Sequence, residues 1–241
     1  MTNNVRIVTF QVTSKTSESI EIGAMSTMTT LAESALFGDA YAALKQAAIG
    51  IGSVQIRNAA TIGGNIANAS PASDIAPVLS VLGAEAVIAD AEGFTRRSTI
   101  DNLLIGLGKT SLKHNEAIVR FIIPKTQIQK SAFVKLGYRK TQTISRIGLA
   151  ITLEFDQSGF IASAGVVAGA IAPVPVHVKK AEQYLIGKNP GPQAAAAIGE
   201  ILSELIMKIT PKEFDRDYKA RAAFGITDDI MKIIKPGQET H

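Results

Sequence analysis

The chain has 241 residues, which is enough for one or two domains with a substantial core. Charged residues make up only 19% of it and the formal net charge is +4, with basic residues scattered rather than massed. Together with four tyrosines and no tryptophan for base stacking, this argues against nucleic-acid binding. The absence of cysteine excludes disulfides and any cysteine-ligated iron–sulfur cluster in this chain.

The sequence also gives little support for a metal-binding protein or a membrane protein. The three histidines, His114, His177 and His241, stand apart without ligand spacing, so we expect no structural zinc site. The N-terminus lacks the apolar stretch of a signal peptide. The longest uncharged run, Phe160–Val176, is shorter than a span of about twenty residues and contains prolines, so we read it as a buried strand followed by a turn. The sequence predicts a cytoplasmic chain without a membrane span, and its low charge suits a subunit of a larger complex or a well-packed monomer.

The first half of the chain predicts strands that alternate with short helices. β-Branched and aromatic runs favour strands, and apolar residues at helical spacing favour helices. The expected elements are strands at Val5–Val12 and Ser19–Ala24, helices at Thr29–Ala35, Ala40–Gly50 and Ile75–Leu82, a hairpin of Gly83–Ala89 with Thr95–Ser98 about Glu92-Gly93, a short helix or turn at Thr99–Leu104, and a strand at Ala117–Ile123.

The segment from Ile51 to Asp74 carries a double glycine, Gly63-Gly64, inside a run of small and polar residues. These polar residues are Thr61, Asn65, Asn68, Ser70, Ser73 and Asp74. Glycine permits positive φ and close backbone approach, and successive N–H groups in such a turn form an anion site suited to a diphosphate. We therefore expect Thr61–Asp74 to be mostly non-regular, to border the main concave site, and to hold Gly63 or Gly64 at positive φ. An isolated Gly-Gly of this kind is more often a plain turn.

The second half begins after a polar link, Lys125–Lys130, which we take as the boundary between domains at 1–126 and 127–241. The expected elements are strands at Ser131–Arg139, Ile147–Phe155 and Ile161–Ala168, a hairpin loop at Asp156–Gly159, and helices at Val178–Ile186, Gln193–Met207 and Asp215–Ile234. Strands followed by helices predict an α+β arrangement, here a three-stranded antiparallel sheet with helices on one side.

The glycine-containing segment resembles the flavin-binding loop of the FAD subunits of molybdenum hydroxylases, the group of xanthine dehydrogenase and carbon monoxide dehydrogenase. The matching strings are QIRN at 55–58, ATIGGNI at 60–66, ASP at 69–71 and SD at 73–74. Further likeness at Glu21–Ala24, Glu116–Pro124 and Phe133–Lys140 extends the resemblance over about Ser19 to Lys235. It implies an FAD-binding (PCMH-type) α/β subdomain, followed by a domain like the C-terminal domain of the CO dehydrogenase flavoprotein.

The resemblance also implies a set of cofactor-binding residues. They are Ile56, Ala60, Thr61, Ile62, Gly63, Gly64, Asn65, Ser73, Asp74, Ile118 and Lys135. The glycine amides would face the diphosphate, and Thr61 and Asn65 would add side-chain hydrogen bonds. Asp74 would accept hydrogen bonds from cofactor hydroxyls.

Other members of this set would meet the rings of the cofactor. Ile56, Ala60 and Ile118 would lie against the flavin or the adenine. Lys135 would face the polar edge of the flavin and stabilise its reduced, anionic form.

Each assignment has a simpler alternative. Asp74 reads by itself as the N-cap of the Ile75–Leu82 helix. Ile56, Ala60 and Ile118 read by themselves as core residues. Lys135 reads as part of a solvated basic face with Arg139, Lys140 and Arg146.

The chain has no nucleophile–base motif of its own, so any redox chemistry would come from the cofactor.

The function implied by the resemblance is that of an oxidoreductase subunit. Electrons would leave a molybdopterin centre on one partner subunit, pass through iron–sulfur clusters on another, reach FAD on this chain, and continue to NAD or another acceptor. Flavin subunits of this family carry a second glycine-rich loop nearer the N-terminus, and no glycine precedes Ser19 here, so we expect a truncated FAD-binding domain with an incomplete FAD site that binds weakly. The alternatives are a flavin-free structural or assembly subunit of such a complex and a stand-alone small-molecule binding domain.

Overall fold

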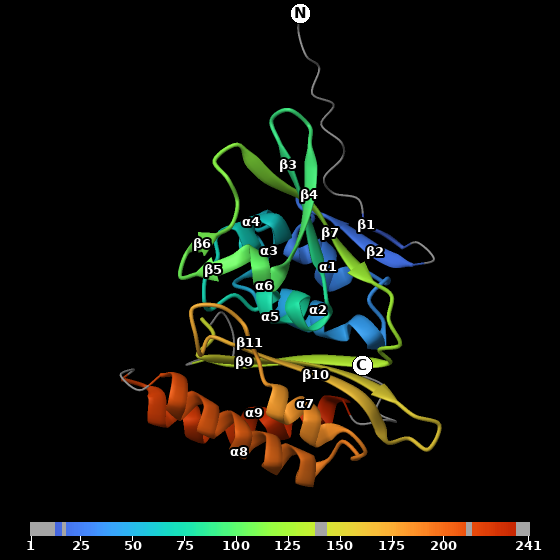
Figure 1. Ribbon diagram of the computed structural model, residues 1–241, viewed down its shortest axis with the longest axis vertical. Helices are drawn as coiled ribbons and strands as arrows, with labels where there is room; N and C mark the ends of the chain where they lie inside the picture. The colour runs from blue at the N-terminus through green and yellow to red at the C-terminus, as the bar shows by residue number, and fades with distance from the viewer. Residues whose placement is uncertain (1–12, 16–17, 138–143, 211–213, 235–241) are drawn as a thin grey trace, which may run out of the picture.

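A computed structural model describes residues 13–15, 18–137, 144–210 and 214–234. A five-stranded sheet and a four-stranded sheet are separated by a layer of short helices, and the last three helices cover the outer face of the second sheet (Figure 1). This is the α+β class that the sequence predicts. The strand expected at Val5–Val12 and the end of the one expected at Ser131–Arg139 lie outside the described residues.

The first half is built on an antiparallel sheet in the order β1-β2-β7-β3-β4. Its strands are β1 (Thr13–Lys15), β2 (Ser19–Gly23), β3 (Glu85–Asp90), β4 (Thr95–Thr99) and β7 (Glu116–Pro124). Its helices are α1 (Met28–Glu33), the 3-10 turn η1 (Asp39–Tyr41), α2 (Ala42–Ile49), α3 (Val54–Ala59), α4 (Ile62–Ala67), α5 (Ile75–Val81) and α6 (Ile100–Leu103). A separate ladder joins β5 (Leu104–Gly106) to β6 (Lys109–Thr110). The β3–β4 hairpin turns at Gly93, whose φ is 92°, as the sequence predicts.

The second half has one strand more than expected. Its strands are β8 (Lys130–Leu136), β9 (Ile147–Phe155), β10 (Ile161–Gly169) and β11 (Val176–His177), in the order β11-β10-β9-β8. Its helices are α7 (Lys179–Leu185), α8 (Pro192–Ile209) and α9 (Arg216–Ile234). The prediction of three strands is wrong because Val176–His177 pairs with Val167 and Ala168. A strand of two residues is too short to show the alternation by which strands are recognised.

Strand β9 is buried on both faces, which explains its nearly continuous apolar sequence. Leu149, Ile151 and Leu153 face the core formed with α8 and α9, whereas Ala150 belongs to the core of the first half. This division follows from the two-residue period of a strand. The second sheet is therefore the common wall of two cores.

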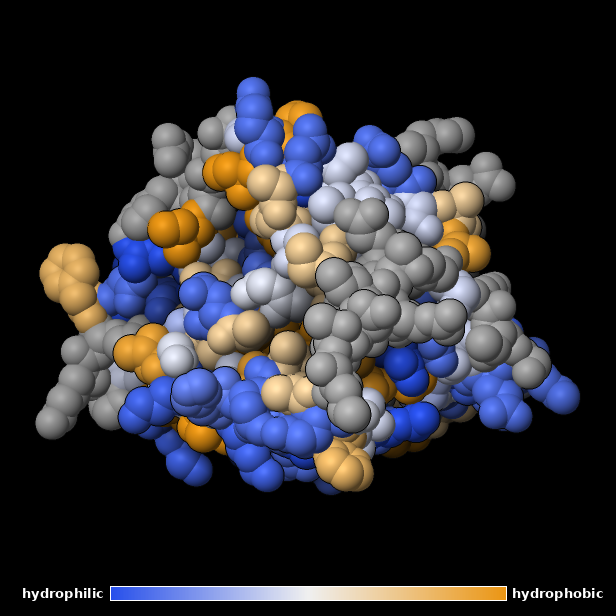
Figure 2. Space-filling view, turned by 90° about the horizontal axis from the view of Figure 1, so that it is seen from above, coloured by the Kyte–Doolittle hydropathy of each residue, from blue (hydrophilic) through white to orange (hydrophobic). Residues whose placement is uncertain are grey.

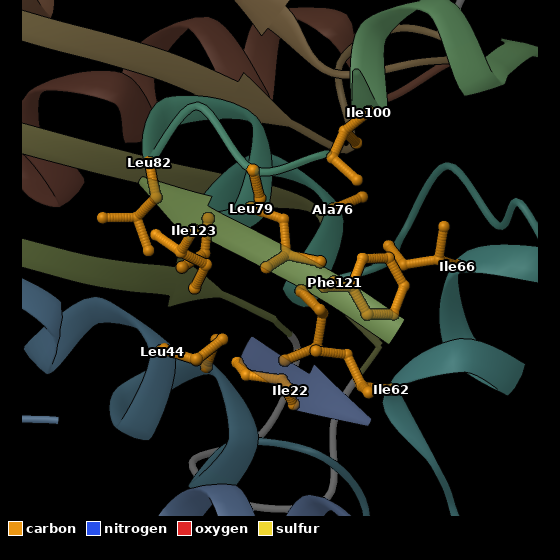
Figure 3. Packing of buried hydrophobic residues seen from close by; sticks show 14 of the residues in the cluster. Ile22, Leu44, Ile62, Ile66, Ala76, Leu79, Leu82, Ile100, Phe121 and Ile123 are labelled. Atoms are coloured by element: carbon orange, nitrogen blue, oxygen red, sulfur yellow. The ribbon is translucent and has the colours of Figure 1, made fainter. Parts of the chain in front are cut away.

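The core of the first half gathers side chains from both the sheet and the helices. Figure 3 shows Phe121 and Ile123 of β7, Ile62 of α4, Leu79 of α5 and Leu44 of α2 directed toward a common centre. All five side chains are fully buried. This packing fixes α4, which carries four of the residues expected at the cofactor site, and α5, which Asp74 directly precedes.

The two halves are joined by more than apolar packing. The Ala43 amide at the start of α2 donates to Ser131 Oγ over 3.1 Å, and the Phe133 amide donates to Gln46 Oε1 over 2.7 Å. Phe133 also enters the core of the first half. Helix α2 is thus anchored along β8.

A second junction forms around His177. Ser80 Oγ on α5 donates to Asp101 Oδ1 over 2.6 Å, so its oxygen accepts from His177 Nε2, 3.0 Å away. Asp101 Oδ2 lies 3.1 Å from the same nitrogen, and Glu182 Oε1 lies 3.5 Å from His177 Nδ1. Both ring nitrogens face oxygen atoms, an arrangement that favours the imidazolium. The hydrogen bond to Asp101 is the main cause that raises the pKa of His177 above its usual 6.5, while partial burial opposes it.

We expect the free energy of unfolding to fall as pH rises through the pKa of His177 in the folded chain. A group whose pKa is raised on folding stabilises the fold fully below its unfolded pKa, about 6.5, and this stabilisation is lost as pH passes the folded value. The loss should be at most about 1 kcal/mol, because the ion pairs are partly exposed. Urea unfolding near pH 6 and near pH 8.5 measures it. His177→Gln should flatten the dependence, and an equal loss in the variant would show that another group titrates.

Candidate functional site

The double glycine lies in a helix. Thr61–Asp74 is mostly non-regular, as the sequence predicts, because residues 68–74 form turns and irregular backbone, but α4 spans Ile62–Ala67 and contains both Gly63 and Gly64. Neither glycine has a positive φ; in this segment that conformation occurs at Gly52, with φ 45°, and at Ala69, with φ 46°.

Hydroxyl side chains begin both short helices of this segment. Ser53 Oγ accepts from the Ile56 amide at the start of α3, and Thr61 Oγ1 accepts from the Gly64 amide at the start of α4, over 3.3 and 3.1 Å. These caps are the signal in the sequence that would have identified the helices.

Gly63 is needed for packing between α4 and the end of β2. Its amide donates to the Ala24 carbonyl over 2.8 Å. A Cβ at this position would lie 2.7 Å from Ala24 Cβ and 2.8 Å from Ala24 O. The missing side chain therefore allows two backbones to touch, independently of any ligand.

The amides at the start of α4 already have acceptors within the chain. Ile62 donates to Ser26 O, Gly63 to Ala24 O, Gly64 to Thr61 Oγ1 and Asn65 to Thr61 O, over 2.8 to 3.1 Å. In this conformation a diphosphate would have to compete for each of these four groups. To bind a diphosphate here, the chain would therefore have to use side-chain donors, or α4 would have to rearrange and release these amides.

The outward surface of α4 does offer polar groups beside bare backbone. Gly64 is exposed, and the position of its absent Cβ has one close neighbour, Thr61 Oγ1, at 3.0 Å. Asn65 is partly exposed, and its Oδ1 accepts from Ser73 Oγ over 2.6 Å, so the donors of this side chain are the two N–H groups of Nδ2. The Thr61 hydroxyl and the Asn65 amide are donors that fit hydroxyl or phosphate oxygens of a ligand lying against Gly64.

Asp74 is buried at the junction of the two halves. Its Oδ2 accepts from Lys135 Nζ over 2.6 Å, and its Oδ1 accepts from Ser145 Oγ. Lys135 Nζ also donates to the Gly50 carbonyl at the end of α2, over 2.8 Å. Burial raises the pKa of Asp74 above its usual value, although the charge of Lys135 and the hydrogen bonds from Lys135 and Ser145 act in the opposite direction.

Two of the simpler alternatives are wrong. Asp74 makes no side-chain bond that caps α5; instead Ser73 Oγ accepts from the Ala76 amide over 3.1 Å. Lys135 is not on a solvated face, since its side chain is 16% exposed and its ammonium is paired with Asp74.

The apolar members of the expected set are divided. Ile62 and Ile118 are buried in the core of the first half, and Ala60 packs against it. Ile56 is 52% exposed on α3 and lies over the Gly52 turn. The structure therefore brings Thr61, Gly64 and Asn65 to one surface, with the buried Ser73 bonded to Asn65, and Asp74 and Lys135 form the junction between the halves, while Ile118 is a core residue.

The described residues on the face of the first half that Figure 2 shows form no broad apolar area. Seen from that end of the molecule, apolar residues of the described part form separate small patches among hydrophilic ones (Figure 2). Within the described residues, no helix combines the length and the apolar character needed to cross a membrane.

Comparisons with known proteins agree with this architecture. Residues 4–126 match the model of the FAD binding domain in molybdopterin dehydrogenase, and residues 132–231 match that of the CO dehydrogenase flavoprotein C-terminal domain. The nicotinate dehydrogenase FAD-subunit of Eubacterium barkeri is 31% identical over 86% of this chain and 71% of its own length. The xanthine dehydrogenase FAD-binding subunit of Escherichia coli O157:H7 is 33% identical over 90% of this chain and 73% of its own. A crystal structure of quinoline 2-oxidoreductase from Pseudomonas putida 86 shares the fold, with a TM-score of 0.84 and 23% identity over 95% of this chain and 80% of that one.

Gly63→Ala is expected to lower the free energy of unfolding by about 1–3 kcal/mol, the usual cost of adding a methyl group to a filled site. Gly64→Ala is the matched control in the same helix. It should be close to neutral, because helices favour alanine over glycine by up to about 1 kcal/mol and its Cβ meets only the movable Thr61 side chain. Urea unfolding of both variants tests the difference, and equal losses would contradict the assigned role of Gly63.

Proposed function

The chain belongs to the family of FAD-binding subunits of molybdopterin-dependent dehydrogenases, and we propose that it passes electrons from iron–sulfur clusters of a partner subunit, through FAD, to NAD or another acceptor. The match of residues 4–126 to the family's FAD binding domain carries this proposal. The exposed Gly64 with its neighbouring donors supports it from the structure.

The proposed contacts with FAD assign different tasks to the residues of the site. The Thr61 hydroxyl and the Asn65 amide would donate to phosphate or sugar oxygens that approach Gly64. Ser73 would hold Asn65 in place through its 2.6 Å hydrogen bond. Ile56 would present an apolar surface to a ring of the cofactor. Bound FAD would supply the electron-transfer chemistry, and Lys135 would favour negative charge on a nearby flavin edge.

The remaining members of the proposed set act through the shape of the site. Ala60, Ile62, Gly63 and Ile118 lie in or against the core and would fix the position of the α3–α4 wall. Asp74 would orient Lys135, with which it shares the junction between the halves.

The proposal includes partners that hold the other redox centres. Because this chain has no cysteine, the iron–sulfur clusters would belong to one partner subunit and the molybdopterin to another. We place the complex in the cytoplasm and divide this chain into an FAD-binding domain at 1–126 and a C-terminal flavoprotein domain at 127–241.

A flavin-free structural or assembly subunit is the second candidate. Two observations favour it: the first amides of α4 are all bonded within the chain, and the charge of Lys135 is compensated by Asp74. Flavin absorbance of the purified chain and of its complex separates the two functions.

Titration of the full chain with FAD tests the proposed function, and Thr61→Val tests the site. Loss of a hydrogen bond to a charged acceptor costs about 1.5–3 kcal/mol, so the variant should bind FAD at least about tenfold more weakly. Thr99→Val is the matched control, because Thr99 caps α6 with the same kind of bond, to the Asn102 amide. It should lose similar stability and keep its affinity for FAD. Absence of FAD binding by both the chain and its complex would favour the flavin-free subunit instead.

A further inference from the structure

The segment that carries Asp74 is held against the end of β10. The Ala170 amide, just beyond β10, donates to the Pro71 carbonyl over 3.1 Å. A Cβ on Gly169 would lie 3.0 Å from Pro77 Cγ, so strand and segment are in close contact there as well. Among the described residues, the non-glycine residues with left-handed backbone are Ala69 and Ala170, with φ of 46° and 60°. Ala170 lies at this contact and Ala69 precedes Pro71 by two residues, and such residues persist only where surrounding structure holds them.

A buried lysine holds Ala170 from the other side. Lys219 on α9 is 7% exposed, and its Nζ donates to the Ala170 carbonyl over 3.1 Å. Asp215 Oδ1, one turn earlier, lies 3.7 Å from the same nitrogen. A lysine is rarely buried unless it is paired, so this position is specific for a long cationic donor.

The other oxygen of Asp215 leads to Asp74. Asp215 Oδ2 accepts from Arg146 Nη1 over 2.5 Å. Arg146 follows Ser145, whose hydroxyl donates to Asp74. The pairing of Gly148 with Gly169 places Arg146 and Ala170 at the same end of the β9–β10 ladder. The start of α9 therefore contacts both chain segments that contact residues 71–74.

We propose that Lys219 and Asp215 are positioning residues for residues 71–74. Lys219 acts through Ala170 on Pro71, and Asp215 acts through Arg146 and Ser145 on Asp74. The inference rests on the proposed function for its consequence, FAD affinity, although the contacts themselves do not depend on it. Helix α9 covers the outer face of the second sheet, opposite α5 (Figure 1), so the coupling passes around the end of that sheet. Flavin binding thus depends on α9, a helix that lies away from the surface around Gly64 where the flavin cofactor is expected.

Lys219→Met, which removes the charge and keeps the length of the side chain, is the principal test in the full chain. We expect the FAD dissociation constant to rise about tenfold, equivalent to about 1.4 kcal/mol. Hydrogen exchange of the Ala170 amide and of the Ser73 amide, which donates to Ser70 O, should accelerate at least as much. Exchange at Ile122, in the distant β7, should not change. Lys219→Arg should restore part of both losses, because arginine also donates to a carbonyl.

Lys232→Met is the control on the same helix, since Lys232 is exposed and pairs with Asp228 at the same i,i+4 spacing. It should alter neither exchange nor affinity. If Lys219→Met fails to fold, Asp215→Asn should give the same effects in weaker form. If neither the wild-type chain nor its complex binds FAD, the proposed function is wrong, and faster exchange at Ser73 still decides the positioning role. Unchanged exchange at Ala170 and Ser73, or an acceleration shared equally by Ile122, would overturn the inference.

Discussion

The buried pair of Asp74 and Lys135 is the interaction on which the arrangement of the site depends. The side chain of Asp74 is 5% exposed and that of Lys135 is 16% exposed, and removing one partner of a buried pair costs about 3–5 kcal/mol. Asp74 stands at the start of α5, Lys135 lies on β8, and the second bond of Lys135 goes to Gly50 at the end of α2. The pair therefore fixes two helices of the first half against a strand of the second.

This constraint makes the two halves one structure, although the chain passes between them only once. Phe133, Ala150 and Val167 come from the second sheet and complete the core of the first half. Separated from that sheet, α2 and α5 would expose apolar faces to water, at about 25 cal/mol for each Å² of apolar surface. A boundary at residues 126 and 127 thus divides the sequence into two segments that share a core, and the expected flavin surface is supported by both of them.

The sequence correctly predicts the strands and helices that a short stretch of residues marks by its own pattern. Strands β9 and β10 appear as apolar runs, and α5, α8 and α9 as amphipathic or buried helices with boundaries close to the observed ones. The helix α4 was missed because glycine has low helix propensity, which the Thr61 cap and the contact of Gly63 with Ala24 overcome. Family resemblance supplied the candidate residues, but not their contacts. Nothing near Lys135 in the sequence indicates Asp74 or Ser145 as partners, and no pattern marks Lys219 as buried, because these contacts arise only when distant segments pack together.

The same pair also limits what Lys135 can do for a flavin. While Asp74 is ionised, a ligand beside the pair meets a compensated charge, whose field falls off faster than that of a lone cation. The raised pKa of Asp74 moves the pH at which Lys135 would be left uncompensated toward neutrality. Under the proposed function, the electrostatic effect of this chain on bound FAD therefore depends on the protonation of Asp74 as well as on the position of Lys135. The hydrogen bond from Ser145 bears on that protonation as well, because it favours the charged form of Asp74.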